Sequence, residues 1–456
     1  MKEFDLVVVG GGTGGLSAVR SARWAGKSAA LISQGEPGGD CTFTGCVPSK
    51  ALISVAARGG SFAEAMHRVR SSIDTISVTE SMATLRQQGI EVIDGRATMV
   101  APDTVDVDGT RIRGARIVIA TGAQPVVPTI PGLDQVDALT NENIFDLSDA
   151  PQSLAVLGAG PVGCELAQAL ARLGVEVTVF EALDRVLARE EPRASAVVQA
   201  ALEADGVSVR VGQPVVECRS VAGGVEMIAD GAEPVTVERV LVSVGRRPSS
   251  QGMGLQEIGV ELDQRGHIQV DGHLRTAVDG VYAVGDVTGL LPFTHAADEM
   301  GRLAAGHALG FHPRWKFDPS VVPWATFTDP EVARIGPTEA EAATMGGRVA
   351  ELSMSDFDRA ITDHRTEGFI KIITGPKTFT RRLFGGRVIG ATVVGPRAGE
   401  TINELALAVR TGMFTGRLGQ TVHAYPTWGF AIPQTVAQFF HEVDGRRARP
   451  ARADGG

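Results

Sequence analysis

The feature that most constrains the fold is a glycine-rich loop that occurs twice. The first copy follows the apolar run Asp5-Leu-Val-Val-Val-Gly10 and reads Gly10-Gly-Gly12-Thr-Gly-Gly15. The second follows Leu154-Ala-Val-Leu157 and reads Gly158-Ala-Gly160-Pro-Val-Gly163. A single loop of this kind also arises by chance or in an ordinary tight turn. Two copies, each between a strand pattern and a helix pattern, indicate two Rossmann-type nucleotide-binding units.

Glycines in such a loop let the backbone turn tightly and approach a pyrophosphate, whose charge meets the N–H groups and dipole of the following helix. The sequence therefore predicts that the chain binds two dinucleotides. The expected binding residues are Gly10, Gly12 and Gly15 in the first loop and Gly158, Gly160 and Gly163 in the second.

A third region, from about Trp315 onward, has no such loop. It alternates strand patterns at residues 369–373 and 388–394 with a helix pattern at residues 401–410, which is typical of an α+β domain. From about residue 445 the sequence is basic and lacks apolar periodicity, so we expect a disordered tail rather than a binding arm.

Composition excludes several classes of protein. The net charge of −10 argues against a nucleic-acid or anionic-membrane partner, because both require basic surface. No apolar run reaches the roughly 18 residues of a membrane span. The acidic start, Met1-Lys-Glu-Phe-Asp5, does not fit a signal peptide, so we expect a cytoplasmic protein. Four cysteines in 456 residues cannot form a secreted disulfide framework.

Two of the four cysteines lie close together in Gly38-Gly-Asp-Cys41-Thr-Phe-Thr-Gly45-Cys46-Val-Pro48-Ser-Lys50. Pro48 is typical of the first turn of a helix, so we expect Cys46 to begin one. A regular helix would separate residues five apart by about 7.5 Å, too far for a disulfide. A bond between the sulfurs therefore requires Cys41 to lie in a loop that folds back at Gly45. The helix start would lower the pKa of Cys46.

Three interpretations of this pair remain. The spacing and the helix start favour redox chemistry. The alternatives are two buried thiols that pack as small hydrophobes, and half of a zinc site. Zinc is disfavoured because the chain has no C-x-x-C pair, and Cys164 and Cys218 lie singly in the second unit. We expect those two cysteines to pack in the core, and we expect no metal site.

The cysteine segment, joined to two dinucleotide loops, resembles the class I pyridine nucleotide-disulfide oxidoreductases, which include dihydrolipoamide dehydrogenase, glutathione reductase and mercuric reductase. The resemblance covers nearly the whole chain through Ala120-Thr-Gly122, Val244-Gly-Arg246-Arg-Pro248, Tyr282-Ala-Val-Gly-Asp286, Phe327-Thr-Asp-Pro-Glu331 and Gly399-Glu-Thr-Ile-Asn-Glu404. It implies an α/β protein with an FAD-binding domain (1–149 and 271–315), an NAD(P)-binding domain (150–270) and an α+β dimerisation domain (316–456). It also implies a homodimer in which the last domain completes the partner's site.

The resemblance further implies which residues bind the cofactors. Asp286 would hold the ribitol of FAD, although an ordinary turn aspartate is the alternative, and Thr294 would open a helix that faces the flavin. Ser33 stands where the family usually has an acid, so we expect weaker FAD retention. The remaining residues implied for FAD are Lys50, Ala97, Thr121 and Gly122, and Gly245 is implied for the nicotinamide nucleotide.

The resemblance also implies a route for electrons from NADH through FAD to Cys46. Cys41 would then become the exposed thiol that attacks the acceptor. Lys50 and Glu165 would pair beside the flavin, where the alternative is a surface ion pair of little energetic consequence. The expected catalytic residues are therefore Cys41, Cys46, Lys50, Glu165 and Tyr425.

Glu181 ends the strand pattern Val175-Glu-Val-Thr-Val-Phe-Glu181, after the second glycine loop. A carboxylate at this point accepts hydrogen bonds from ribose hydroxyls and repels a 2′-phosphate. We therefore expect NADH to be preferred, although Arg185 and Arg189 leave a route to the phosphate of NADPH.

The chain departs from the family near its C-terminus. The resembling dehydrogenases and glutathione reductases have a His–Glu pair that moves protons to the thiols, whereas the matching positions here are Tyr425 and Phe430. Acid–base catalysis of this kind contributes about 10²–10⁴ in rate, and a tyrosine is a poor substitute. His423 is an alternative base, but a packed or surface histidine is the favoured interpretation. Tyr425 and the segment Phe293-Thr-His295 resemble the mercuric reductase branch, but the chain lacks the vicinal C-terminal cysteines of that branch, which argues against mercury as the natural acceptor.

We therefore predict an NAD(P)H-dependent flavoprotein that reduces a small acceptor, such as a disulfide, a metal ion or a quinone, through Cys41 and Cys46. One alternative is a conventional dihydrolipoamide dehydrogenase. The other is an FAD-binding redox sensor with little turnover.

Overall fold

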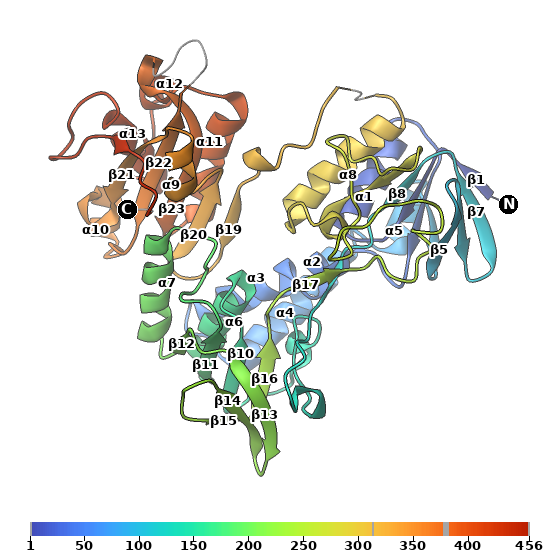
Figure 1. Ribbon diagram of the computed structural model, residues 1–456, viewed down its shortest axis with the longest axis horizontal. Helices are drawn as coiled ribbons and strands as arrows, with labels where there is room; N and C mark the ends of the chain where they lie inside the picture. Colours follow the sequence, from blue (N-terminus) through green and yellow to red (C-terminus); the bar gives the residue numbers. More distant parts are fainter. Residues whose placement is uncertain (1, 312–313, 377–382, 455–456) are drawn as a thin grey trace. The chain divides into compact units, whose positions relative to one another are not determined.

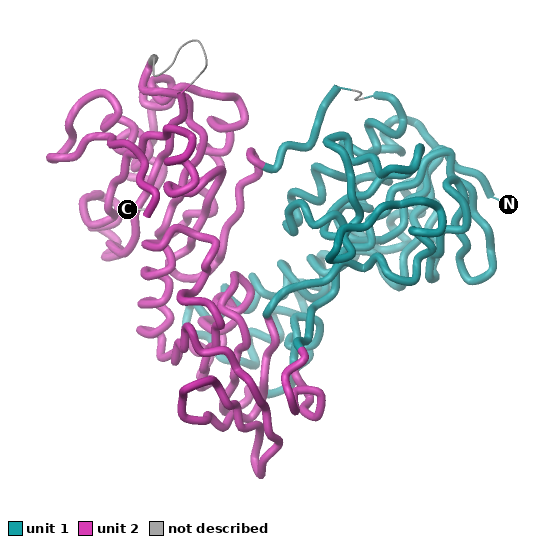
Figure 2. The backbone as a smooth tube through the Cα atoms, in the orientation of Figure 1, with its two compact units in different colours: residues 1–128, 139–149, 244–319 teal, residues 129–138, 150–243, 320–456 magenta. Residues whose placement is uncertain are grey.

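The computed structural model describes residues 2–311, 314–376 and 383–454 (Figure 1). The chain divides into two compact units (Figure 2). Unit 1 contains residues 1–128, 139–149 and 244–319, and unit 2 contains residues 129–138, 150–243 and 320–456. Residues 244–270, which the sequence assigns to the nucleotide domain, belong to unit 1 by this division. The three-domain division stays a prediction.

Unit 1 is built on a five-stranded parallel sheet in the order β18-β8-β2-β3-β4. Its strands are β2 (Leu6–Val9), β3 (Ala29–Ser33), β4 (Glu91–Asp94), β8 (Ile117–Ile119) and β18 (Val281–Ala283). Helices α1 (Thr13–Trp24) and α8 (Thr294–Ala308) pack against each other. The first predicted strand, loop and helix are confirmed, although Trp24 is 83% exposed at the end of its helix.

The other elements of unit 1 surround this sheet. A second sheet has the order β1-β7-β6-β5, and β9 pairs with β17. The strands are β1 (Lys2–Phe4), β5 (Ala97–Ala101), β6 (Thr104–Val107), β7 (Thr110–Gly114), β9 (Ala123–Pro125) and β17 (Arg246–Pro248). The helices are α2 (Gly39–Phe43), α3 (Cys46–Ala56), α4 (Phe62–Ser77) and α5 (Met82–Gln87).

Unit 2 begins with the second nucleotide fold. A parallel sheet has the order β12-β11-β10-β16, and an antiparallel sheet has the order β13-β14-β15. The strands are β10 (Ser153–Leu157), β11 (Glu176–Glu181), β12 (Ser208–Val211), β13 (Val215–Val221), β14 (Gly224–Ala229), β15 (Val235–Val237) and β16 (Arg239–Val242). Helix α6 (Pro161–Arg172) follows β10, as predicted, and α7 (Pro192–Ala204) follows β11.

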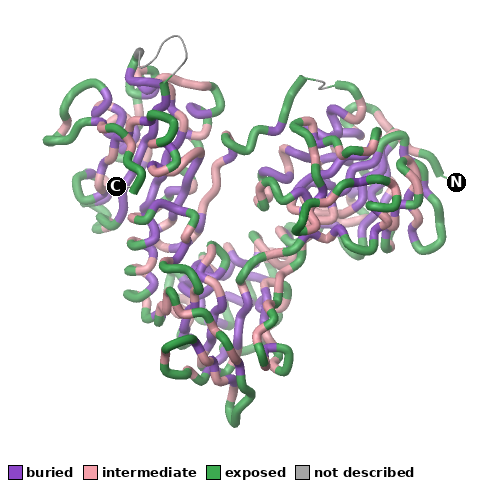
Figure 3. The backbone as a smooth tube through the Cα atoms, viewed as in Figure 1, coloured by how far each residue is buried: buried purple, intermediate pink, exposed green. Residues whose placement is uncertain are grey.

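The rest of unit 2 is a six-stranded antiparallel sheet with helices, which confirms the predicted α+β region. The sheet has the order β19-β20-β23-β22-β21-β24. Its strands are β19 (Trp324–Thr326), β20 (Glu331–Ile335), β21 (Arg348–Ser353), β22 (Phe369–Gly375), β23 (Arg387–Gly395) and β24 (Arg449–Pro450). Its helices are α9 (Glu339–Thr344), α10 (Asp358–Thr362), α11 (Ala398–Thr411), α12 (Thr415–Gln420) and α13 (Ala431–Ala437). Strand β22, near the middle of this sheet, is buried along its whole length (Figure 3).

The expectation of a disordered tail from about residue 445 is wrong for the described residues. Arg449 and Pro450 pair with β21 as β24, and Ala448 is buried. Arg449 forms an ion pair with Glu339, a fully buried acid that also pairs with the buried Lys371. The arginine is held because a buried carboxylate is stable only when paired. The last two residues, 455–456, lie outside the described part.

Among the described residues, no helix combines the length and the apolar character needed to span a bilayer.

Candidate active site

The two cysteines of unit 1 lie at the junction of α2 and α3. Cys46 is the first residue of α3, as predicted, and Pro48 lies in the first turn. Cys41, however, lies in the short helix α2 rather than in a loop. The chain reverses between the two helices at Gly45, where a Cβ atom would come within 2.7 Å of the Asp40 carbonyl oxygen. Only glycine allows this approach, which brings the two sulfurs together.

The two sulfur groups are in hydrogen-bond contact with each other. The pKa of Cys41 is raised, first because its thiol hydrogen-bonds to Cys46, and then because of burial and the charge of Cys46. Cys41 therefore keeps its proton and donates it toward Cys46. The Cys46 sulfur also lies 3.4 Å from the Thr294 hydroxyl, at the first residue of α8.

The exposure of the two thiols differs from the expectation. Cys46 is exposed, whereas Cys41, expected to be the exposed thiol, is half-buried. The reason is the packing of α2, which contacts both α3 and α4.

The two glycine loops share one geometry. A Cβ atom at Gly15 would lie 1.9 Å from the Gly10 carbonyl oxygen, and one at Gly163 would lie 2.0 Å from the Gly158 carbonyl oxygen. The third glycine of each loop is therefore required by the close approach of helix and strand. At the second glycines, Gly12 and Gly160, a Cβ atom would meet nothing within 4 Å and would project into open space at the start of a helix. Both loops thus fit a pyrophosphate that contacts helix N–H groups.

The other residues expected at FAD lie at strand ends of unit 1. Ser33 ends β3, and its hydroxyl lies 2.4 Å from where a Cβ atom of Gly11 would be, so it borders the first loop. Ala97 begins β5 and is buried. The Thr121 hydroxyl donates to the Ser249 carbonyl oxygen at 2.7 Å. Gly122, with φ of +71°, accepts a hydrogen bond from the Ser249 amide.

Asp286 faces a positive charge that sequence reasoning did not assign. The Arg246 Nε atom lies 3.7 Å from the Asp286 carboxylate, and the same guanidinium bonds the carboxylate of Asp40 and the carbonyl oxygen of Ala123. Burial raises the pKa of Asp286, and the charge of Arg246 opposes this rise. Asp40 immediately precedes Cys41, so an ion pair ties the cysteine segment to β17.

Glu165 lies buried on α6 of unit 2, where its carboxylate accepts the Phe327 amide proton at 2.8 Å. Two further residues on the same face of α6 contact Asp329: Gln168 bonds its amide and carbonyl groups, and Arg172 pairs with its carboxylate at 3.0 Å. Spacings of three and seven residues from Glu165 are the sequence signal for this face. Lys50 lies on α3 of unit 1, and its pairing with Glu165 stays a prediction.

Glu181 ends β11, as the sequence predicts. One carboxylate oxygen accepts the Ala159 amide proton at 2.7 Å, and the other accepts the Leu183 amide proton at 2.9 Å. The negative charge is thereby fixed beside the second glycine loop. Gly245, with φ of +141°, precedes β17 in unit 1 and accepts a hydrogen bond from Val126.

Tyr425 lies in the exposed loop before α13, 62% exposed. Its hydroxyl donates to the Asp358 carboxylate at 3.0 Å, and this bond is the first cause of a raised pKa of Tyr425. Phe430 packs edge-on against the Tyr425 ring at 5.3 Å between centroids. Sequence reasoning missed Asp358, since no motif marks it and the contact spans 67 residues.

His423 is not an unengaged base. Its Nε2 atom lies 2.9 Å from the Glu404 carboxylate, and its Nδ1 atom lies 2.8 Å from the Thr421 carbonyl oxygen. Both partners are hydrogen-bond acceptors, so both ring nitrogens of His423 are engaged. The sequence pattern marks Glu404 only as part of the motif at residues 399–404, and its contact with His423 spans 19 positions of the chain.

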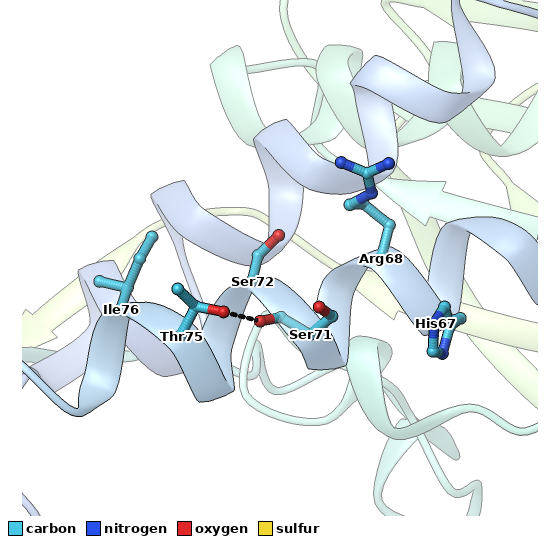
Figure 4. Close-up of a pocket in the computed structure, with 6 residues that line it drawn as sticks. All are labelled: His67, Arg68, Ser71, Ser72, Thr75 and Ile76. Atoms are coloured by element: carbon cyan, nitrogen blue, oxygen red, sulfur yellow. Dashed lines mark hydrogen bonds between the residues drawn. The ribbon is translucent and has the colours of Figure 1, made fainter.

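The remaining cysteines pack as predicted, because Cys164 and Cys218 are both buried. A shallow hollow on unit 1, shown in Figure 4, is lined by one face of α4 from His67 to Ile76 and contains none of the predicted site residues. Within the described residues, no cluster of three or more His, Cys, Asp and Glu side chains could hold a metal ion.

Comparison with known proteins agrees with this geometry. The family model described as pyridine nucleotide-disulphide oxidoreductase matches residues 4–301, and the model of the dimerisation domain of that family matches residues 322–435. A mercuric reductase from Streptomyces lividans is 32% identical, over 96% of this chain and 97% of its own length. A dihydrolipoyl dehydrogenase from Corynebacterium glutamicum is 33% identical, over 97% and 98%.

Two solved structures have the same fold. The HOCl-induced flavoprotein disulfide reductase RclA from Escherichia coli, in a Cu(II) complex, superposes with a TM-score of 0.88 at 28% identity, covering 96% of this chain and 99% of that chain. LpdA from Mycobacterium tuberculosis gives a TM-score of 0.86 at 28% identity, covering 97% and 100%. With two glycine loops, a thiol pair at a helix start and a dimerisation domain, the chain belongs to the pyridine nucleotide-disulphide oxidoreductases, a family of FAD-dependent enzymes that use NAD(P)H.

Proposed function

We propose that the protein oxidises NADH and passes the electrons, by way of FAD and the Cys41–Cys46 pair, to a small acceptor. The observation that supports this most strongly is the contact of the two thiols with each other at the start of α3, with Thr294 beside Cys46. FAD, when bound, would accept a hydride from NADH and would pass the two electrons on to the cysteine sulfurs.

The protein's own residues divide the work between the two sulfurs. Cys46 receives negative charge because the starts of α3 and α8 both meet it, and helix N-termini stabilise anions. Cys41 keeps its proton, since its raised pKa follows from donation to Cys46. Reduction of a disulfide acceptor would use one NADH and one proton and give NAD⁺ and two thiols, with Cys41 and Cys46 returning to their disulfide.

The proposed acceptor class follows from the residues at the C-terminal loop. The His–Glu base pair of the resembling dehydrogenases is replaced by Tyr425 and Phe430, and His423 is engaged with Glu404. Without that base, protonation of a departing thiolate is slow. A metal ion needs no such proton, and relatives include a mercuric reductase and a reductase solved with Cu(II). We place a soft metal ion first and a small disulfide or quinone after it.

The proposed coenzyme is NADH. Glu181 carries its charge beside the second glycine loop, where it would accept ribose hydroxyls and repel a 2′-phosphate. The Arg185 guanidinium bonds the Ala188 carbonyl oxygen and the Asp184 carboxylate, which reduces its availability for a phosphate.

The proposal includes a homodimer. The dimerisation domain supports it, and Tyr425 and the adjoining Val422, 96% exposed, offer a surface for a second copy. In this arrangement Tyr425 would face the cysteine pair of the partner subunit. We place the activity in the cytoplasm, where NADH is supplied.

The experiment that tests the proposal is an NADH-oxidation panel with Cu²⁺, Hg²⁺, lipoamide, glutathione disulfide and a quinone. Wild-type protein should prefer a metal ion, and Cys46→Ser should abolish this turnover. Tyr425→His should raise lipoamide turnover by about tenfold or more, because it restores an imidazole. Preference of the wild type for lipoamide would instead identify a dihydrolipoamide dehydrogenase. Slow flavin reduction by NADH with every acceptor would identify a redox sensor.

A further inference from the structure

We propose that Asp358 is a positioning residue that fixes the direction of the Tyr425 hydroxyl and thereby selects acceptors by charge. This inference rests on the proposed function, in which Tyr425 faces the electron acceptor. Nothing in the sequence connects the two residues, which the fold brings within 3.0 Å across 67 positions.

The loop that carries Tyr425 is held by one short helix. Asp358, the first residue of α10, accepts a hydrogen bond from the Tyr425 hydroxyl. The next residue, Arg359, donates a hydrogen bond to the Pro426 carbonyl oxygen at 3.3 Å. Arg359 is itself held by an ion pair with Asp363 at 2.8 Å. Adjacent residues of α10 thus fix both the side chain of Tyr425 and the backbone that follows it.

The ring is also fixed on its other side. Phe430 contacts the Tyr425 ring edge-on, with an angle of 78° between the ring planes. The hydroxyl proton can still rotate about the C–O bond, so the direction in which it points depends on the hydrogen-bond acceptor beside it. Asp358 is the charged group that acts on the phenol and raises its pKa, by its hydrogen bond and by its charge.

The direction of the hydrogen bond decides what the phenol offers to an acceptor. A phenol hydroxyl has one proton and two lone pairs. When the phenol donates its hydrogen bond to Asp358, the lone pairs of the phenol oxygen remain for an incoming molecule. The carboxylate charge of Asp358 then lies behind that oxygen. Such a group attracts a cation and cannot protonate a leaving thiolate. Tyr425 with Asp358 therefore favours a metal cation over a neutral disulfide.

The chemistry balances for both classes of acceptor. With Cu²⁺, one NADH reduces two Cu²⁺ to two Cu⁺ and gives NAD⁺ and one proton. With lipoamide, one NADH and one proton reduce the disulfide to its dithiol. Only the reduction of lipoamide requires a proton to be added to the acceptor. A phenol whose proton is hydrogen-bonded to Asp358 does not assist that step.

The hydrogen bond can be measured without any turnover, because the chain has only two tyrosines and the other, Tyr282, is buried. Holoenzyme labelled with ¹³C at tyrosine Cζ gives two resonances, and Tyr425→Phe identifies the one from Tyr425. In wild type this resonance should titrate above the usual pKa of 10. Asp358→Asn, which keeps an acceptor but removes the charge, should lower the midpoint, and Asp358→Ala should lower it further.

The kinetic test compares kcat/KM for Cu²⁺ with that for lipoamide. Asp358→Asn should lower the ratio by about fivefold, the usual size of one exposed charge interaction, while flavin reduction by NADH stays unchanged. The effect should vanish in a Tyr425→Phe background, because Asp358 acts through the phenol. Asp356→Asn is the matched control, since Asp356 lies two residues away and pairs with Arg446.

Three results would overturn the inference: a Tyr425 midpoint that Asp358→Asn leaves in place, an unchanged ratio, or an equal loss in the Tyr425→Phe background. Failure of the proposed function looks different. In that case wild-type protein reduces no acceptor, which removes the role in selection as well, although the shift of the Tyr425 midpoint would still report the hydrogen bond.

Discussion

The Cys46 sulfur lies 3.4 Å from the hydroxyl of Thr294, although 248 positions separate the two residues in the chain. The contact joins the first residue of α3 to the first residue of α8. The starts of two helices therefore lie beside one sulfur, and helix N-termini in general stabilise negative charge through their N–H groups and dipoles. In the proposed function, this arrangement favours Cys46, rather than Cys41, as the sulfur that carries negative charge.

Replacement of Thr294 by valine should make Cys46 a weaker nucleophile. The change removes the hydroxyl at the sulfur but keeps the shape of the side chain, so loss of about 1 kcal/mol of thiolate stabilisation is expected. The rate of alkylation by iodoacetamide near neutral pH, measured on reduced protein, should fall about fivefold. Thr75→Val makes the same change on the outer face of α4 (Figure 4) and should leave the rate unaltered. Equal rates in both variants would contradict the role of Thr294.

Two glycines of the second loop should respond differently to alanine. At Gly163 a Cβ atom would collide with the Gly158 carbonyl oxygen at 2.0 Å, so Gly163→Ala should lower stability by about 1–3 kcal/mol. At Gly160 the backbone is extended and the space is open, so Gly160→Ala should fold normally. Its methyl group would nevertheless occupy the approach of a pyrophosphate and weaken NADH binding. Thermal melts and NADH titration check the pair, and a stable Gly163→Ala variant would show that the loop can relax.

Asp329 should make the stability of unit 2 depend on acid pH. Burial alone would raise the pKa of Asp329, but Arg365 and Arg172 outweigh it and lower the pKa below 3.8. A carboxyl group with a lowered pKa in the folded state stabilises the fold above its unfolded pKa, and this contribution is lost as the pH falls through the folded value. Because its side chain is 35% exposed, we expect only about 1 kcal/mol.

The measurement for Asp329 is a series of thermal melts of wild type and Asp329→Asn. The difference in Tm should be constant near neutral pH and should shrink as the pH falls below about 4, where the wild-type carboxylate takes up its proton. A difference that grows toward acid pH would show that the arginines do not stabilise the charged form.

Glu181→Gln should weaken discrimination between the two nicotinamide coenzymes. Glutamine keeps an acceptor for the Ala159 or Leu183 amide but removes the charge that opposes a 2′-phosphate. We expect the ratio of kcat/KM for NADH to that for NADPH to fall about tenfold, mainly through improved use of NADPH. The ratio is measured by reduction of the bound flavin. An unchanged ratio would move the origin of coenzyme choice to another residue.

Much of the fold could be predicted because its signals are local. The glycine loops predicted β2 with α1 and β10 with α6, since an apolar strand, a tight turn and a helix follow one another in the chain. The start of α3 at Cys46 followed from Pro48. The prediction of a disordered tail was wrong, because a basic composition cannot show that Arg449 forms an ion pair with the buried Glu339.

The sequence by itself determined the two nucleotide units, the α+β region, the cysteine pair and the replacement of the His–Glu pair of the resembling dehydrogenases. Each of these features is visible in residues that lie close together in the chain. Only the tertiary structure decided which partners these residues receive. The Thr294 hydroxyl contacts the Cys46 sulfur, the Glu404 carboxylate contacts the His423 ring, and Asp358 accepts a hydrogen bond from Tyr425. The physical reason is that hydrogen bonds and charges act over a few ångströms in space, whatever the distance along the chain, and folding alone sets that spacing.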